Sequence, residues 1–83
     1  MKKDFKENDL KLILSQVFNV AIESINDQSS RHTIEKWDSL HQMHLIVALE
    51  EAFNVTFTDE QTMGMITYQV IKMVLAEQGI ILQ

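Results

Sequence analysis

The scarcity of turn-forming residues is the strongest constraint on the fold of this chain. Its 83 residues include no proline and only two glycines. An all-β fold needs many tight turns, and such turns depend heavily on these two residues. The length suits one small domain with a modest hydrophobic core. We therefore expect a single helical domain over residues 1–83, in which about residues 1–7 form a flexible basic tail.

Apolar spacing predicts the first two helices. The first extends from Asn8 to Phe18, with Asn8 or Asp9 as its N-cap. The second lies within residues 36–53, with Asp38 as its N-cap. Each is followed by an asparagine, Asn19 or Asn54, which tolerates the left-handed conformation that ends helices.

Two shorter patterns predict the remaining helices. Thr58 and Gln61 fit a capping box that opens a brief third helix. Thr67 can cap a last helix, which Gly79 would end. The connection over residues 20–37 is polar but contains spaced isoleucines, so we expect it to pack over the core. The expected fold is all-α: a small four-helix bundle with a long loop between helices 1 and 2 and a short third helix.

The second helix has two apolar stripes where a surface helix needs one. At about 100° per residue, one stripe contains Leu45, Ile46, Leu49 and Phe53, and nearly opposite lie Leu40, Met43 and Val47, flanked by Glu50 and Glu51. Both stripes could be core if this helix is central in the bundle. Alternatively, the stripe of Leu40, Met43 and Val47 is exposed and docks partner proteins. The pattern leaves both interpretations open.

Charge and composition exclude several classes of function. The net charge is −5, and no Lys or Arg occurs between Lys36 and Lys72, so nucleic-acid binding is not expected. The absence of cysteine excludes disulfides and thiolate metal sites. His41 and His44 lack further ligands at suitable spacing, so no metal is expected. No segment has the pattern of a signal peptide or membrane span, which favours a cytoplasmic protein without membrane insertion.

Ser39 stands at the first turn of the second helix. Its simplest role is that of a capping or first-turn residue. The helix N-terminus also favours a phosphate attached to this serine, because it presents unpaired N–H groups and a partial positive charge. A catalytic nucleophile is not expected, since His41 and His44 are poorly placed and no G-x-S-x-G elbow surrounds the serine. We expect no catalytic residues.

The string Asp38-Ser39-Leu40 resembles the D-S-L attachment motif of acyl carrier proteins. The resemblance extends from about Asp9 to Gln78. It includes the sequence DSLHQMHLIVALEEAF, the long loop, the TDEQ segment and the Ile-Thr pair before the last helix.

The resemblance implies a defined function. A phosphopantetheinyl transferase would attach 4′-phosphopantetheine to Ser39, between Asp38 and Leu40, and the terminal thiol of the arm would hold acyl groups. The protein would be a monomeric carrier rather than an enzyme, charged by a ligase or synthase and serving acyltransferases. The residues that match the partner-facing surface of the family are Leu40, Met43, Val47, Glu50 and Glu51.

Some residues depart from the pattern of the fatty-acid carriers. His41, His44 and Ala52 stand where many of those carriers have acids, which favours a specialised carrier that stands alone and serves one pathway. Trp37 replaces a commonly small residue, and either anchors the loop or contacts the arm. A second hypothesis is an unmodified helical adaptor that binds partners through the same face.

Overall fold

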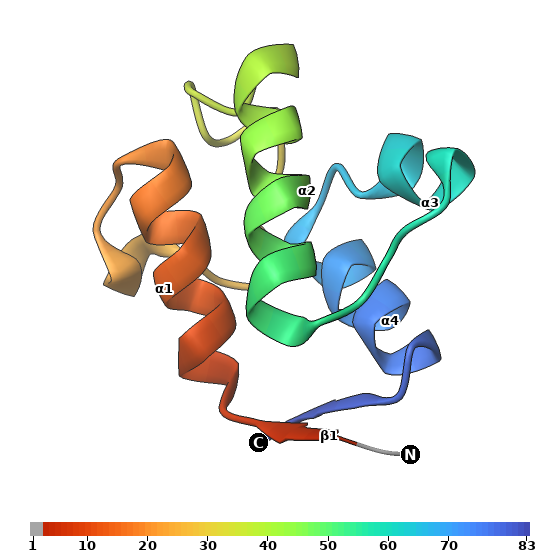
Figure 1. Ribbon diagram of the computed structural model, residues 1–83. Helices are drawn as coiled ribbons and strands as arrows, with labels where there is room; N and C mark the ends of the chain where they lie inside the picture. Colours follow the sequence, from red (N-terminus) through yellow and green to blue (C-terminus); the bar gives the residue numbers. More distant parts are fainter. Residues whose placement is uncertain (1–2) are drawn as a thin grey trace.

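The computed structural model describes residues 3–83. For Lys3 it describes the backbone alone. Within the described residues, four α-helices form most of the structure, as the sequence predicts. The elements in chain order are β1 (Lys3–Phe5), α1 (Glu7–Phe18), the 3₁₀ turn η1 (Ile22–Ser24), α2 (Ser39–Phe53), α3 (Asp59–Gly64), α4 (Tyr68–Glu77) and β2 (Ile80–Leu82). Helix α2 runs through the middle of the molecule, with α1 on one side and α3 and α4 on the other (Figure 1).

Local side-chain chemistry sets most of the helix ends. Asp38, Thr58 and Thr67 each accept a hydrogen bond from a backbone N–H in the first turn of the helix that they cap. Asn19 and Asn54 both adopt the left-handed conformation with φ of 54° at the ends of α1 and α2. These caps agree with the expectations from the sequence, because each depends on residues only a few positions apart.

The start of α1 differs from the prediction. The helix begins at Glu7, and its N-cap is Lys6 rather than Asn8 or Asp9. The Asp9 carboxylate instead reaches back and accepts a hydrogen bond of 3.2 Å from the backbone N–H of Lys6. Asp9 therefore acts from the third helical position, where a carboxylate satisfies the cap residue from inside the helix.

The two ends of the described chain form a small parallel sheet that the sequence did not predict. Lys3, Asp4 and Phe5 pair with Ile80, Ile81 and Leu82. The pairing brings both ends together below the helices (Figure 1). The flexible tail expected over residues 1–7 is thus wrong for residues 3–7, since they belong to β1, the cap and α1; residues 1 and 2 lie outside the described part.

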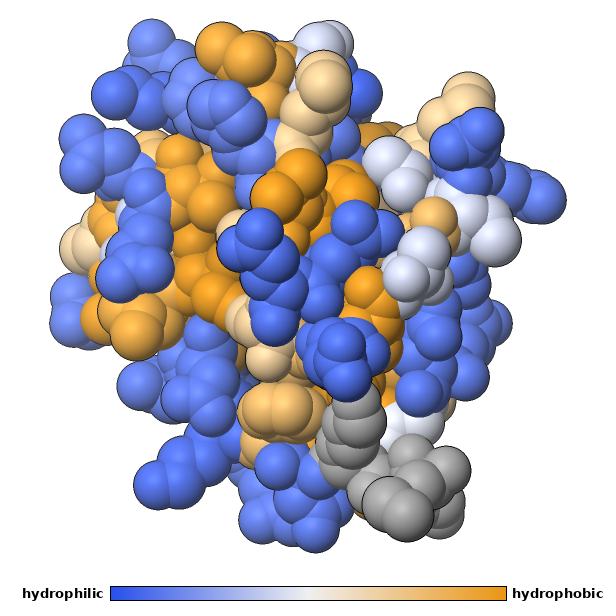
Figure 2. Space-filling model, in the orientation of Figure 1, coloured by the Kyte–Doolittle hydropathy of each residue, from blue (hydrophilic) through white to orange (hydrophobic). Residues whose placement is uncertain are grey.

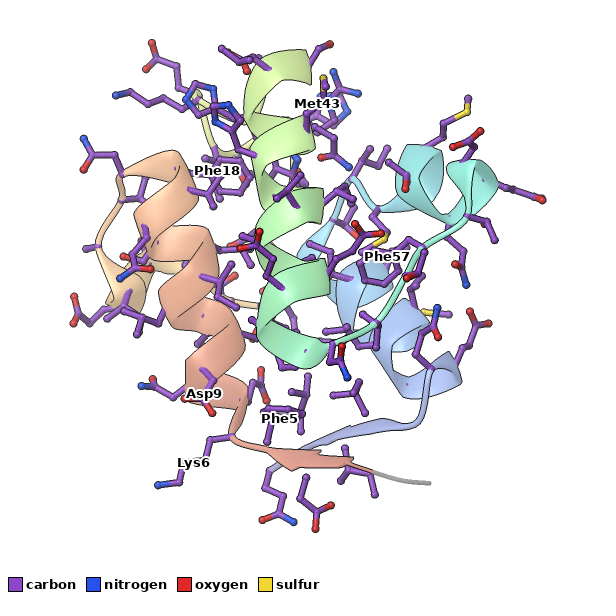
Figure 3. The ribbon with its side chains drawn as sticks, in the orientation of Figure 1. Phe5, Lys6, Asp9, Phe18, Met43 and Phe57 are labelled. Carbon is purple, nitrogen blue, oxygen red and sulfur yellow. The ribbon has the colours of Figure 1, made fainter. Side chains whose placement is uncertain are left out.

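The core lies between α2 and the elements around it. Its fully buried side chains include Leu14 and Phe18 of α1, Leu49 of α2 and Tyr68 of α4. Phe5 packs edge-on against Phe53 with ring centroids 4.7 Å apart. Phe5 lies below the end of α2, and Phe57 lies between α2 and the α3–α4 side (Figure 3).

The long loop packs over the core, as its isoleucines predict. Ile25 and Ile34 are buried. Ser29 is also buried; its carbonyl accepts a hydrogen bond from the backbone N–H of Tyr68, and its hydroxyl accepts one from the backbone N–H of Asn26. Trp37 is 2% exposed and stacks on Phe18 at 4.7 Å, so it anchors the end of the loop.

Candidate functional site

Ser39 is the first residue of α2, and its side chain is exposed. Asp38 caps the helix by accepting a hydrogen bond of 2.9 Å from the backbone N–H of His41. The N–H of Gln42 donates to the Asp38 carbonyl. The N–H groups of Ser39 and Leu40 have no hydrogen-bond acceptor within residues 3–83, so they add to the positive end of the helix beside the serine hydroxyl.

Asp38 and His41 form a pair that fixes the head of the helix. The His41 Nδ1 atom lies 2.8 Å from the Asp38 carboxylate. The hydrogen bond from the His41 backbone N–H, reinforced by the His41 side chain, lowers the pKa of Asp38 below its usual value. The capping carboxylate therefore stays ionised and oriented toward His41.

The second stripe of α2 is exposed, although the helix is central. Leu40 is 58% exposed, Met43 66% and Val47 53%. The opposite stripe of Leu45, Ile46, Leu49 and Phe53 is buried. The interpretation that both stripes are core is therefore wrong, because only one stripe is buried. Large exposed apolar side chains that follow one helix face suit contact with another protein.

Glu50 has a structural contact that the sequence pattern did not indicate. Its carboxylate accepts a hydrogen bond of 3.0 Å from the backbone N–H of Phe57, which is buried. The contact fastens the α2–α3 connection to α2. Glu51 is exposed and lies next to it. Nothing in the sequence around Glu50 signals this contact, because it depends on how the chain folds back after Asn54.

A surface hollow of about 280 Å³ lies beside Ser39. Its lining comes from the long loop, α2, α3 and the α3–α4 connection: Arg31, Ser39, Gln42, Thr62, Met63 and Ile66. Met63 is 78% exposed, so an apolar side chain of α3 stands at this hollow in addition to the α2 stripe. No sequence pattern indicates Arg31 or Met63 as site residues, since only the fold brings them near Ser39.

Gln42 lines this hollow and forms three side-chain hydrogen bonds. Its amide nitrogen donates to the carbonyls of Thr62 and Met65 at 3.1 and 3.0 Å. Its amide oxygen accepts from the Trp37 indole. The side chain of Gln42 therefore ties α2 to the end of α3 and to the loop anchor, and the position of α3 beside Ser39 is fixed.

Other classes of site find no support in the described residues. The rings of His41 and His44 lie 5.8 Å apart, and no cluster of three or more potential metal ligands occurs within residues 3–83. Within the same residues, no helix has the length and apolar character needed to span a membrane.

A second, apolar hollow lies between α1 and α2 and includes Ala52. Ala52 is 13 residues, or about 20 Å along the helix, from Ser39. Figure 2 shows apolar side chains along this face of α1 and α2.

Comparison with known proteins decides the family. No protein-family model matches the chain. The acyl carrier protein of Buchnera aphidicola subsp. Schizaphis graminum (strain Sg) is 33% identical over 63 residues, which cover 76% of this chain and 80% of that protein. The chain belongs to the acyl carrier protein family. Membership supports a carrier role in general, and it favours a carrier over a catalyst.

Acyl carrier proteins generally carry 4′-phosphopantetheine, and the residues around Ser39 fit such a group. A phosphate on the serine would meet the N–H groups at the start of α2, which have no protein acceptor within residues 3–83. It would also lie beside the hollow that Arg31 lines. The neighbouring Asp38 carboxylate is already bonded to His41. The N–H groups of Ser39 and Leu40 therefore remain available as donors to an anion attached at Ser39.

Proposed function

We propose that this protein is a stand-alone acyl carrier, modified on Ser39 with 4′-phosphopantetheine. It presents acyl groups to enzymes of a fatty-acid, polyketide or other specialised biosynthetic pathway. The observation that carries the proposal is the exposed Ser39 of the D-S-L motif at the head of α2, beside an exposed apolar stripe. Family membership supports the carrier role, and the site geometry supports the choice of serine.

The group, when bound, supplies a thiol that holds acyl groups as thioesters, a chemistry that a chain without cysteine lacks. The protein provides the attachment point and its surroundings. Ser39 offers its hydroxyl, and the phosphopantetheinyl transferase provides the activation that the carrier lacks. Asp38 holds the first turn of α2 in place through its bond to His41. Leu40 flanks the serine with an exposed apolar side chain that the transferase can contact.

Partner enzymes would dock on the exposed face of α2. Leu40, Met43 and Val47 supply an apolar strip, and the flexible side chain of Met43 can adapt to different grooves. Glu51 and Glu50 add negative charge at the far end of the strip, which would attract a basic patch on the partner. Glu51 would be the more available of the two for a partner, because the Glu50 carboxylate also accepts a hydrogen bond from the backbone N–H of Phe57.

Intact mass measurement tests the attachment. Apo-protein is incubated with coenzyme A and a broad-specificity phosphopantetheinyl transferase. We expect the wild type to gain the mass of one phosphopantetheine group and Ser39→Ala to gain none. Ser24→Ala is the matched control, because Ser24 is also exposed but lies in the loop, and it should be modified like the wild type. A wild type that stays unmodified, or a modified Ser39→Ala, would refute the proposal.

The second candidate is an adaptor that binds partners without an arm. The exposed stripe of α2 favours it as well, because docking alone needs no modification. It predicts equal partner binding by the wild type and Ser39→Ala. The carrier predicts that only modified protein accepts an acyl group from a ligase or synthase.

The specialised role of the carrier rests on His41, His44 and Ala52. We propose that these residues weaken recognition by general fatty-acid enzymes, because they replace the acids that many fatty-acid carriers share at these positions. The variant His44→Glu restores an acid at an exposed position and keeps both members of the Asp38–His41 pair. We expect such enzymes to load it several-fold faster than the wild type, as measured by thioester formation on modified protein. An unchanged rate, with correct folding, would argue against specialised recognition through this position.

A further inference from the structure

We propose that Arg31 binds the phosphodiester that would join Ser39 to the prosthetic arm, and so positions the base of the arm. The inference rests on the modification of Ser39 proposed above and deepens it by assigning a residue outside the attachment motif. Arg31 and Ser39 line the same hollow, although one belongs to the long loop and the other to α2.

The loop holds Arg31 at a fixed place relative to the serine. The Arg31 backbone N–H donates to the Ile66 carbonyl at 3.1 Å. The preceding residue, Ser30, forms an isolated antiparallel bridge with Thr67. Ser30 is also bonded to Thr33 through both its backbone N–H and its carbonyl. The backbone of Arg31 is thus attached to the α3–α4 connection, on the side of the molecule where the hollow lies.

The guanidinium of Arg31 is free to bind an anion. Arg31 is the sole arginine of the chain, and within residues 3–83 it forms no ion pair. By contrast, Lys72 is occupied by the carboxylates of Glu7 and Asp27. The other residues that line the hollow come from the segment between Lys36 and Lys72, which contains no Lys or Arg. Arg31 therefore supplies the positive charge of the hollow.

Two polar groups near the serine are already engaged. Gln42 uses its amide for Trp37, Thr62 and Met65. The carboxylate closest in sequence to the serine, that of Asp38, is held by His41. A phosphate on Ser39 would therefore meet the N–H groups at the start of α2 and the guanidinium across the hollow.

Arginine suits this role because its planar fork can donate two parallel hydrogen bonds to phosphate oxygens. Such a contact would limit the rotation of the arm about the serine oxygen and direct it along the hollow toward Met63 and Ile66. Since the contact is exposed, added salt should weaken it.

The test uses nuclear magnetic resonance of apo- and modified protein. With one arginine, the ¹⁵N spectrum contains a single side-chain Nε–Hε signal, and we expect modification of Ser39 to shift it. In the ³¹P spectrum of modified protein, Arg31→Gln should shift the phosphodiester signal, and Arg31→Lys should give an intermediate value. High salt should move the wild-type ³¹P signal toward that of Arg31→Gln.

Lys36→Gln is the matched control, because Lys36 is an exposed cation three residues before Ser39 that does not line the hollow. It should leave the ³¹P signal at the wild-type position. Identical ³¹P signals in the wild type and Arg31→Gln, or an equal change in Lys36→Gln, would overturn the inference while leaving the attachment intact. A protein that the transferase cannot modify would remove both proposals. The apo spectrum of Arg31→Gln verifies its fold.

Discussion

Glu50 and Glu51 are adjacent acids near the end of α2, and only the Glu50 carboxylate has a hydrogen-bond partner in the described part of the chain. Glu50 bonds to the backbone N–H of Phe57, whereas Glu51 is exposed and has no hydrogen-bond partner in the described part of the chain. The sequence assigns both to one partner-facing pair, because charge pattern alone cannot show that the chain returns past Glu50. The fold separates a residue with a structural contact from one available to partners.

Glu50→Ala should destabilise the fold. The substitution leaves the N–H of Phe57 without its acceptor, which should lower the free energy of unfolding by about 1–2 kcal/mol. Urea denaturation measures the change. Glu51→Ala is the control, and it should stay within about 0.5 kcal/mol of the wild type while weakening binding to basic partners. Equal stability of the two variants would contradict the structural role of Glu50.

Asp38 should make the fold sensitive to acid. Its pKa is lowered in the folded state by the His41 backbone N–H, so the unfolded chain takes up a proton first as the pH falls. The stabilisation is therefore present above the usual Asp value of 3.8 and is lost as the pH falls below it. Asp38→Asn keeps a capping oxygen but cannot titrate. The stability advantage of the wild type over Asp38→Asn should shrink between about pH 5 and pH 3 in urea denaturation; a constant difference would contradict the assignment.

The elements differ in how far the sequence determines them. The ends of α2, α3 and α4 follow from side chains a few residues apart, such as Asp38 with His41 or Thr58 with Gln61, so local chemistry predicts them. The strands β1 and β2 are three residues long and pair across almost the whole chain. Neither carries an alternating pattern, and their pairing depends on helices that bring the two chain ends together, so local chemistry does not predict it.

Phe5→Ala tests the contribution of β1 to the fold. Phe5 is half-buried and packs against Phe53, and its backbone is bonded to Gln83. Removing the ring should lower the free energy of unfolding by about 1–3 kcal/mol in urea denaturation. Asp4→Ala, an exposed neighbour in the same strand, should change it by less than about 0.5 kcal/mol. A Phe5→Ala variant as stable as the wild type would restore the expectation of a loosely attached tail.

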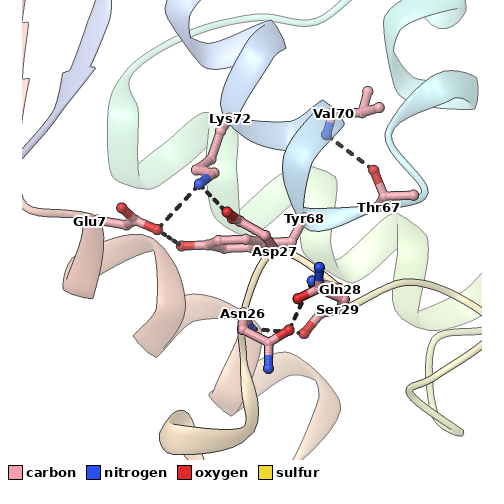
Figure 4. Close-up of polar contacts among 9 residues, drawn as sticks. All are labelled: Glu7, Asn26, Asp27, Gln28, Ser29, Thr67, Tyr68, Val70 and Lys72. Carbon is pink, nitrogen blue, oxygen red and sulfur yellow. Dashed lines mark hydrogen bonds and ion pairs between the residues drawn. The ribbon is translucent and has the colours of Figure 1, made fainter.

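At the scale of the molecule, one polar cluster connects segments that lie far apart in the chain. The Tyr68 hydroxyl donates to the Glu7 carboxylate at 2.9 Å, and the Lys72 ammonium lies 3.4 Å from Glu7 and 2.7 Å from Asp27 (Figure 4). The cluster joins the start of α1, the long loop and α4. It lies among elements other than α2, so its polar contacts do not involve the exposed stripe of α2. No local sequence pattern indicates the cluster, because its members are up to 65 residues apart.

Tyr68→Phe should reveal this cluster through its response to alkaline pH. Burial, reinforced by the hydrogen bond to Glu7, raises the pKa of Tyr68 well above its usual value. Above about pH 10 the unfolded chain loses the phenolic proton while the folded chain retains it, so the stabilisation is present below that pH and is lost above it. Hydrogen bonding to Asp27 raises the pKa of Lys72 as well, but that contribution remains in the variant.

Near neutral pH we expect Tyr68→Phe to lose about 1–2 kcal/mol of unfolding free energy, since the buried ring stays and only the hydroxyl is removed. Above about pH 10 the difference from the wild type should shrink. Tyr68 is the only tyrosine, so tyrosinate absorbance reports its ionisation directly, and it should appear together with unfolding. Ionisation of Tyr68 in the folded protein near its usual pKa would show that Glu7 does not hold the hydroxyl.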